Sequence, residues 1–106
     1  MTEEMGDKQT EGKLDWSLLP WEPLREVVKV YDFGARKYDS FNWHKGVVYS
    51  KLWASMLRHM TQYWLYGERD DKESGCHHMA HVVFWCFAFM TFDGEERSPL
   101  DDRRYL

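Results

Sequence analysis

The chain has 106 residues, enough for one domain, and its 43% hydrophobic and 17% aromatic content excludes a disordered chain. A formal net charge of -4 and an isoelectric point near 5.7 argue against a partner that is a nucleic-acid polymer, which needs a basic surface. Cys76 and Cys86 lie too far apart along one helix for a disulfide, so we expect reduced thiols.

No targeting or membrane segment is expected from the sequence. The stretch from Met1 to Asp15 is charged and lacks the apolar region of a signal peptide. The longest apolar run, Val82 to Met90, is far shorter than the roughly 20 residues of a membrane span. We therefore expect a cytoplasmic domain with no membrane partner.

The N-terminal part is expected to form a flexible polar tail, residues 1–11, and then an ordered arm. The arm, Gly12 to Pro20, carries large apolar side chains that need a surface to pack on. A first helix is predicted from about Pro20 to Tyr38, with Pro23 tolerated in its first turn. Its predicted core stripe comprises Leu24, Val27, Val28, Tyr31, Ala35 and Tyr38.

A second helix is predicted from about Lys51 to Tyr66, after a loop from Asp39 to Val47. Ser50 is expected to cap this helix and Gly67 to end it. The predicted inward stripe comprises Leu52, Met56, His59, Met60 and Tyr63. A histidine therefore falls on the buried side of the helix.

The third helix is predicted from about Ser74 to Phe92, and it is apolar on every side from Val82 to Met90. Two neighbouring helices in so short a chain do not surround it. We therefore expect an all-α fold, with residues 12–94 forming a small bundle of three main helices. A homodimer or larger homo-oligomer would complete this bundle. The charged tail, residues 95–106, is expected to be either extended or disordered.

Three histidines, His77, His78 and His81, stand at the start of the third helix. His78 and His81 are three positions apart and share a helix face with the apolar residues that follow. Two imidazoles beside an apolar stripe indicate a binding site. The alternative is that these histidines are only hydrogen-bonded to partners at the start of the helix, as buried polar side chains usually are.

Acidic and histidine side chains at the helix ends can converge into a metal pocket. The candidate metal ligands are Glu22, Glu26, Asp71, His78 and His81, and the candidate catalytic groups are Glu26, His59 and His78. Carboxylates alone suit Mg²⁺ or Mn²⁺, and imidazoles shift the preference toward Mn, Fe, Ni or Zn. Acids of the 70–73 loop also fit a second interpretation, in which they only complement the N-terminus of the third helix.

A set of cationic and aromatic residues has the chemistry of a nucleotide site, where cations hold phosphates and rings hold the base. The candidate nucleotide-binding residues are Lys13, Lys37, Tyr38, Asn42, Trp43, Lys45 and Arg58. Each lysine alone is also compatible with an ordinary surface charge. The sequence contains no Walker loop, no Gly-x-Gly-x-x-Gly and no nucleophile motif with a paired base.

Several separated motifs resemble one known family. They are Gly12-Lys13-x-Asp15-x-x-Leu18-Leu19-Pro20, Phe33-Gly34-Ala35-x-Lys37-Tyr38, Asn42-Trp43, Gly46, Tyr49-Ser50, Arg58-His59 and Glu73-Ser74-Gly75-x-x-His78-x-Ala80-His81. In this order they resemble the phage and bacterial N-terminal domain of dATP/dGTP diphosphohydrolase. The resemblance implies an all-α, MazG-like enzyme that uses Mg²⁺ or Mn²⁺ to cleave a nucleoside triphosphate to monophosphate and pyrophosphate. It also implies the cytoplasm of a bacterial or phage-infected cell.

The sequence departs from the metal motif of MazG-type enzymes, which is Glu-x-x-Glu on one helix and Glu-x-x-Asp on the next. Glu22 and Glu26 are four positions apart, and the second helix from Lys51 to Tyr66 contains no carboxylate. Catalysis would therefore have to use the glutamate and histidine set.

Three hypotheses follow from these residues. The first is a metal-dependent nucleotide pyrophosphohydrolase. The second is an anti-defence sponge that sequesters a cyclic or ADP-ribose-derived immune signalling nucleotide without breaking it. The third is a purely structural helical dimer. Glu22 or Glu26 within metal-bridging distance of His78, together with an acid of the 70–73 loop, would favour the enzyme. A cavity lined by arginines and aromatics instead would favour the sponge.

Overall fold

The computed structural model describes residues 4–104, apart from the side chain of Ser98. Its elements are the short 3-10 helix η1 (Trp16–Leu18), α1 (Trp21–Lys37), η2 (Asn42–Lys45), α2 (Tyr49–Trp64), α3 (His78–Gly94) and η3 (Ser98–Leu100). Within residues 4–104 the only β pairing is an isolated bridge between Asp70 and His77. The prediction of an all-α fold with three main helices is confirmed. No helix in this range is long and apolar enough to cross a membrane.

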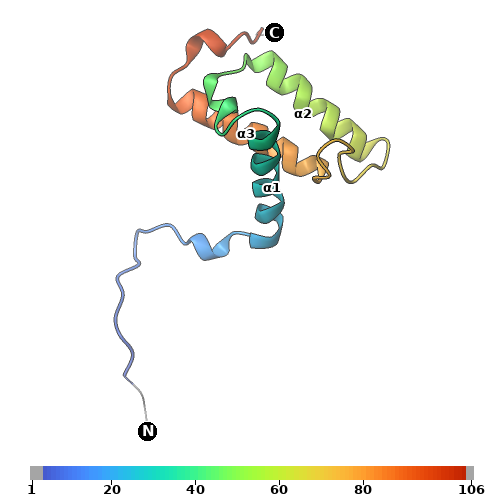
Figure 1. The fold of residues 1–106 in the computed structure, drawn as a ribbon. Helices are drawn as coiled ribbons and strands as arrows, with labels where there is room; N and C mark the ends of the chain where they lie inside the picture. The colour runs from blue at the N-terminus through green and yellow to red at the C-terminus, as the bar shows by residue number, and fades with distance from the viewer. Residues whose placement is uncertain (1–3, 105–106) are drawn as a thin grey trace.

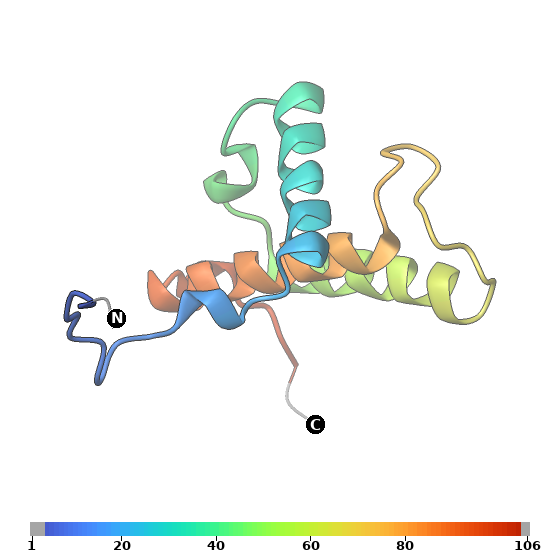
Figure 2. The same cartoon turned by 90° about the horizontal axis from the view of Figure 1, so that it is seen from below.

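The central element is α3, which packs against both other helices. α2 and α3 run antiparallel side by side, and α1 stands across them (Figures 1 and 2). One core cluster joins α1 to α3 through Val27, Val30, Cys76, Ala80 and Phe84. A second joins α2 to α3 through Tyr49, Leu52, Ala88 and Phe92. The crossing of α1 leaves a space between α1 and α2 above α3.

The predicted stripe of the first helix is only partly buried. Val27 is buried as expected, and Val30, which the stripe omitted, is buried too. Val28 and Tyr38 were predicted to face inward, and both are exposed. Val28 lies on the side of α1 away from α3, since the contact with α3 takes up only the narrow face that carries Val27 and Val30. Tyr38 follows the last residue of α1 and lies beyond that contact.

The predicted ends of the second helix also need correction. α2 begins at Tyr49, two residues before the predicted start, and its N-cap is Val48 rather than Ser50. The N-terminus is instead satisfied from outside the helix, because Asp102 Oδ1 accepts a hydrogen bond from the Ser50 backbone N–H at 2.8 Å. At the other end, Met60 and Tyr63 of the predicted inward stripe remain more than a third exposed.

The third helix starts later than its predicted start at Ser74. Residues 71–76 form a tight turn instead, in which Asp71 Oδ2 accepts from the Ser74 N–H at 2.9 Å and Gly75 adopts φ +73°. α3 begins at His78, and its N-cap is His77, whose Nδ1 accepts from the Met79 N–H at 3.0 Å. This turn brings the acidic loop beside the histidines.

The C-terminal tail packs on the body, and it is neither fully extended nor detached. The Arg97 guanidinium lies over the Phe92 ring at 5.0 Å. The side chain of Leu100 approaches Gly46 so closely that a Cβ at Gly46 would lie 3.3 Å from it. Together with the Asp102 contact to α2, these interactions hold residues 97–102 against the beginning of α2.

Candidate functional site

A cavity of about 1040 Å³ occupies the space between the helices. It is lined by the C-terminal half of α1, the 38–43 segment, one face of α2, the 68–73 segment and the first half of α3. Small-molecule sites commonly measure about 300 to 1,000 Å³, so this cavity is large enough for a nucleotide-sized ligand. Every main helix contributes to its wall.

A chain of hydrogen bonds runs through His78 at the cavity wall. Glu68 Oε1 lies 2.7 Å from His78 Nε2, and His78 Nδ1 lies 2.8 Å from His59 Nδ1. A carboxylate accepts, so Nε2 of His78 carries a proton, and the contact with His59 is a hydrogen bond when Nδ1 of His78 accepts. His59 then donates through its Nδ1, which leaves its Nε2 with a free lone pair.

His81 completes the histidine cluster from the next turn of α3. Its ring stacks on that of His59 with centroids 4.2 Å apart and an interplanar angle of 4°. Its Nε2 lies 2.7 Å from Ser74 Oγ and 3.9 Å from Asp71 Oδ2. The turn of residues 71–76 therefore links the acidic loop to the imidazoles.

The surroundings favour the neutral forms of His59 and His81 and the charged form of Asp71. Burial, and then the neighbouring histidines, lower the pKa of His59 to about 4, and burial also lowers the pKa of His81. Burial acts against ionisation of Asp71, but hydrogen bonds from Ser74 and the nearby imidazoles outweigh it and lower the pKa of this carboxyl. Neutral imidazoles and an ionised carboxylate are the forms that bind metal ions.

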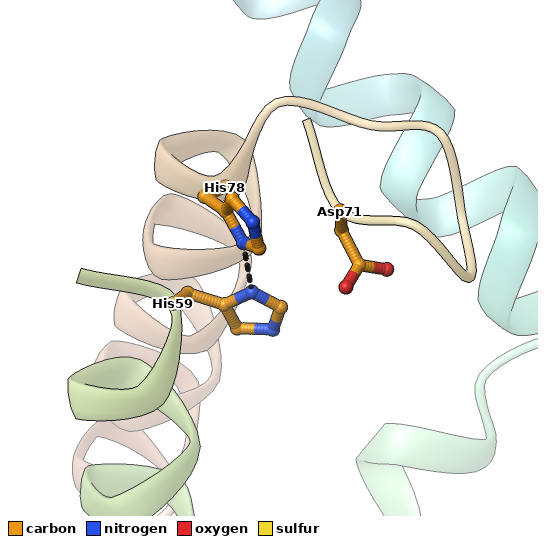
Figure 3. A group of neighbouring side chains, drawn as sticks. All are labelled: His59, Asp71 and His78. Atoms are coloured by element: carbon orange, nitrogen blue, oxygen red, sulfur yellow. Dashed lines mark hydrogen bonds between the residues drawn. The ribbon is translucent and has the colours of Figure 1, made fainter. Parts of the chain in front are cut away.

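Three of these side chains point toward a common space, as Figure 3 shows for His59, Asp71 and His78. One ligand atom of each lies within 4.8 Å of the ligand atoms of the other two. A metal ion with bonds of about 2.1 Å needs its ligands roughly 3 to 4 Å apart, so small side-chain movements would close the site. The Glu68 contact to His78 is the outer carboxylate that metal-binding histidines commonly have.

The basic side chains of the cavity differ in whether they form ion pairs. Lys37 is paired with Glu73, and Lys72 Nζ lies 3.8 Å from Glu68. Lys51 and Arg58 line the cavity from α2, and neither forms an ion pair among residues 4–104. These two cations remain available to an anionic ligand.

The aromatic wall divides into a packed part and an exposed part. The Trp43 ring sits in the core, 6.1 Å from Tyr31 and 6.3 Å from Phe84 in edge contacts, and so anchors the loop before α2. Tyr38 is 59% exposed at the rim, and Phe41 beside it is held in the left-handed region at φ 61°. The exposed rings are the ones a planar base can reach.

The structure brings most of the predicted site residues to this one cavity. Those that line it are Lys37, Tyr38, Asn42, Trp43, Arg58, His59, Asp71, His78 and His81. Lys13, Glu22, Glu26 and Lys45 do not line it. Glu26 pairs with Lys29 at 2.8 Å on the N-terminal half of α1, whereas only the C-terminal half of that helix reaches the cavity.

Glu68 and Ser74 were not among the predicted site residues. Glu68 has no role assigned from the sequence, because no spacing ties it to a histidine ten positions later. The available signal was chemical, since a buried histidine needs a partner for each ring nitrogen. Ser74 was predicted to lie in the third helix. Its contact with His81 depends on the turn that residues 71–76 form where that helix was expected to begin.

The described residues thus form an all-α domain in which an aromatic cavity with charged side chains of both signs lies beside three side chains that could hold a metal ion. A family model described as dATP/dGTP diphosphohydrolase, N-terminal, matches residues 3–103, and the chain belongs to this family. The resemblance inferred from the separated motifs is thereby confirmed. The comparisons with curated proteins and with solved structures found no match.

Proposed function

We propose that this domain binds a purine nucleoside triphosphate with a divalent metal ion and hydrolyses it to the monophosphate and pyrophosphate. The observation that carries the proposal is the convergence of His59, Asp71 and His78 on one space beside a cavity with unpaired basic groups. The family description, dATP/dGTP diphosphohydrolase, supports the reaction class and the purine base.

The ligand set fits a transition metal ion better than Mg²⁺. His59, Asp71 and His78 would hold the ion with two nitrogens and one oxygen, and His78 Nδ1 would bind the ion in place of its hydrogen bond with His59. Such a set suits Mn²⁺, Fe²⁺ or Zn²⁺, whereas Mg²⁺ prefers oxygen ligands. When bound, the ion neutralises charge on phosphate oxygens and lowers the pKa of water. Glu22 and Glu26 are not part of this set.

The basic and aromatic residues give the ligand its orientation in this proposal. Arg58 and Lys51 are unpaired on the cavity face of α2, which also carries His59, so they bind the triphosphate oxygens. The exposed ring of Tyr38 lies at the opposite rim and offers a stacking surface for the base. The phosphates then lie beside the histidine cluster.

The reaction breaks one bond and forms one. A water oxygen bonds to the α-phosphorus, while the bond from that phosphorus to the oxygen bridging the β-phosphate breaks and its electron pair leaves with pyrophosphate. The proton from water passes to a nearby base. His81 fits this role because its ring is neutral and stacks 4.2 Å from that of His59, beside the ionised Asp71.

The test is to incubate the purified protein with dATP or dGTP and Mn²⁺ and to separate the products by anion-exchange chromatography. We expect equal amounts of deoxynucleoside monophosphate and pyrophosphate. Asp71→Asn should reduce the rate on the order of a thousandfold, because it removes the only charged ligand of the cluster. Glu26→Gln, the matched control outside the cavity, should retain the wild-type rate.

Two outcomes would contradict hydrolysis by this site. Equal losses in Asp71→Asn and Glu26→Gln would remove the cluster from the chemistry. Intact nucleotide released by heating the protein, with no product formed under any metal, would assign sequestration instead. Circular dichroism of each variant shows whether its helical content is preserved.

A further inference from the structure

A regular row of exposed apolar side chains runs along α2 on the side away from the cavity. Trp53, Leu57, Met60 and Trp64 are spaced four, three and four residues apart, so they form one stripe. Trp53 is 55% exposed and Trp64 is 80% exposed. The cavity side of the same helix carries Lys51 and Arg58. A stripe with this spacing is typical of the seam between two packed helices.

The N-terminal arm is a second exposed apolar segment. It contains the ordered turn η1, in which Asp15 caps the helix by accepting from the Ser17 N–H at 3.0 Å. Trp16 is nevertheless 67% exposed and Leu18 is 81% exposed. The arm leads away from the helical body (Figure 1). Its apolar side chains therefore have little contact with their own chain.

The surface area of the chain exceeds that of a compact monomer. The chain exposes 8974 Å², whereas a compact monomer of 12.8 kDa exposes about 6,300 Å². A deduction of roughly 1,800 Å² for the first eleven residues, the upper limit for a segment of their mass, leaves roughly 7,200 Å². A compact chain of the remaining mass exposes about 5,800 Å², so an excess of roughly 1,300 Å² remains. A standard protein interface buries about 800 Å² per partner, so the excess is enough for one stable interface.

We propose that this surface is covered by a second copy of the same chain, in a two-fold homodimer. The α2 stripes of the two copies pack against each other, and the arm of each copy lies on the other. Charge is compatible with this contact, because α2 has no acidic residue and its Lys51 and Arg58 face the cavity.

The first test is the mass of the wild-type chain by analytical ultracentrifugation, which should be twice 12.8 kDa. Leu57→Glu places a charge in the centre of the stripe and should raise the dimer dissociation constant at least about 100-fold. Leu65→Glu is the matched control, because Leu65 lies off the stripe and is 69% exposed. Helical content by circular dichroism should be the same in both variants.

A second measurement keeps the proposal testable if Leu57→Glu fails to fold. In a Cys86→Ser background, Leu57→Cys should be joined to its own copy by a short bis-maleimide, and Leu65→Cys should not. A monomeric wild-type chain would overturn the proposal. A dimer that survives Leu57→Glu, or that cross-links equally at both positions, would also overturn it.

Discussion

The antiparallel pair of α2 and α3 has two ends with opposite chemistry. At the end where α2 closes and α3 begins, the interface consists of His59, His78 and His81 with acids of the 68–71 segment. At the other end, Tyr49 and Leu52 pack against the buried Ala88 and Phe92. The α2–α3 pair therefore carries the candidate site at one end and an apolar core at the other.

The two ends differ in how much their contacts contribute to the free energy of folding. Among the described residues, each fully buried side-chain nitrogen or oxygen has a hydrogen-bond partner, so the polar end leaves no such atom unsatisfied. Paired polar groups still contribute less to folding than apolar burial. We therefore expect stability to depend mainly on the apolar end and ligand binding mainly on the polar end.

The largest expected effect is at the apolar end. Phe92 is fully buried beside Trp43, with ring centroids 6.2 Å apart. Phe92→Ala should lower the free energy of unfolding by about 3 to 5 kcal/mol, since it removes a large buried ring and leaves a cavity. Urea denaturation followed by circular dichroism measures this change. Phe41→Ala, at an exposed ring with φ 61°, is the control and should have little effect. Similar losses of unfolding free energy in both variants would show that stability does not depend mainly on the apolar end.

The next largest effect belongs to the polar end. Glu68→Gln removes the carboxylate that accepts from His78 Nε2, so the ring loses the partner that fixes its orientation. Affinity for Mn²⁺, measured by calorimetry, should fall about 10- to 100-fold while stability changes little. Glu73→Gln, which breaks the ion pair with Lys37, is the comparison variant. An equal fall in Glu73→Gln would show that Glu68 has no specific positioning role.

The smallest effect is a pH dependence at the apolar end. Burial and the hydrogen bond to Asp93 raise the pKa of Tyr49 from 10.0 to about 12. The folded state holds this proton more tightly than the unfolded state, so the contribution is complete below pH 10 and is lost as the pH rises toward 12. Tyr49→Phe should cost about 1 kcal/mol below pH 10 and reduce the alkaline loss of stability. Urea denaturation across this range measures both. Tyr66→Phe, at an exposed tyrosine, should leave the profile unchanged.

The helices were predictable because their apolar residues recur with helical spacing. Val27, Leu52 and Met56 were assigned to the core from that spacing alone, and all three are buried. The crossing of α1 was not predictable, because periodicity defines a face and not the partner helix that covers it. Val28 was therefore expected inside and lies outside.

The sequence predicted which types of residue form the site, but only some of the individual residues. His59 and His78 were recognisable as polar groups on apolar faces, and the fold places them in contact. Glu26 was expected opposite them, but the direction of α1 places it away from the cavity. The carboxylate that contacts His78 belongs instead to Glu68. Glu68 lies in a loop whose path depends on tertiary structure.

The cavity wall is drawn from all three helices and from both of the segments that join them. A ligand held there would oppose the separation of every pair of helices at once, so its binding energy would add to the stability of the whole domain. At a hundred times its dissociation constant, a ligand adds about 2.7 kcal/mol, which raises the melting temperature of so small a domain by roughly 10 °C or more. A thermal-shift screen of nucleotides with and without Mn²⁺ can therefore identify the natural ligand without any turnover.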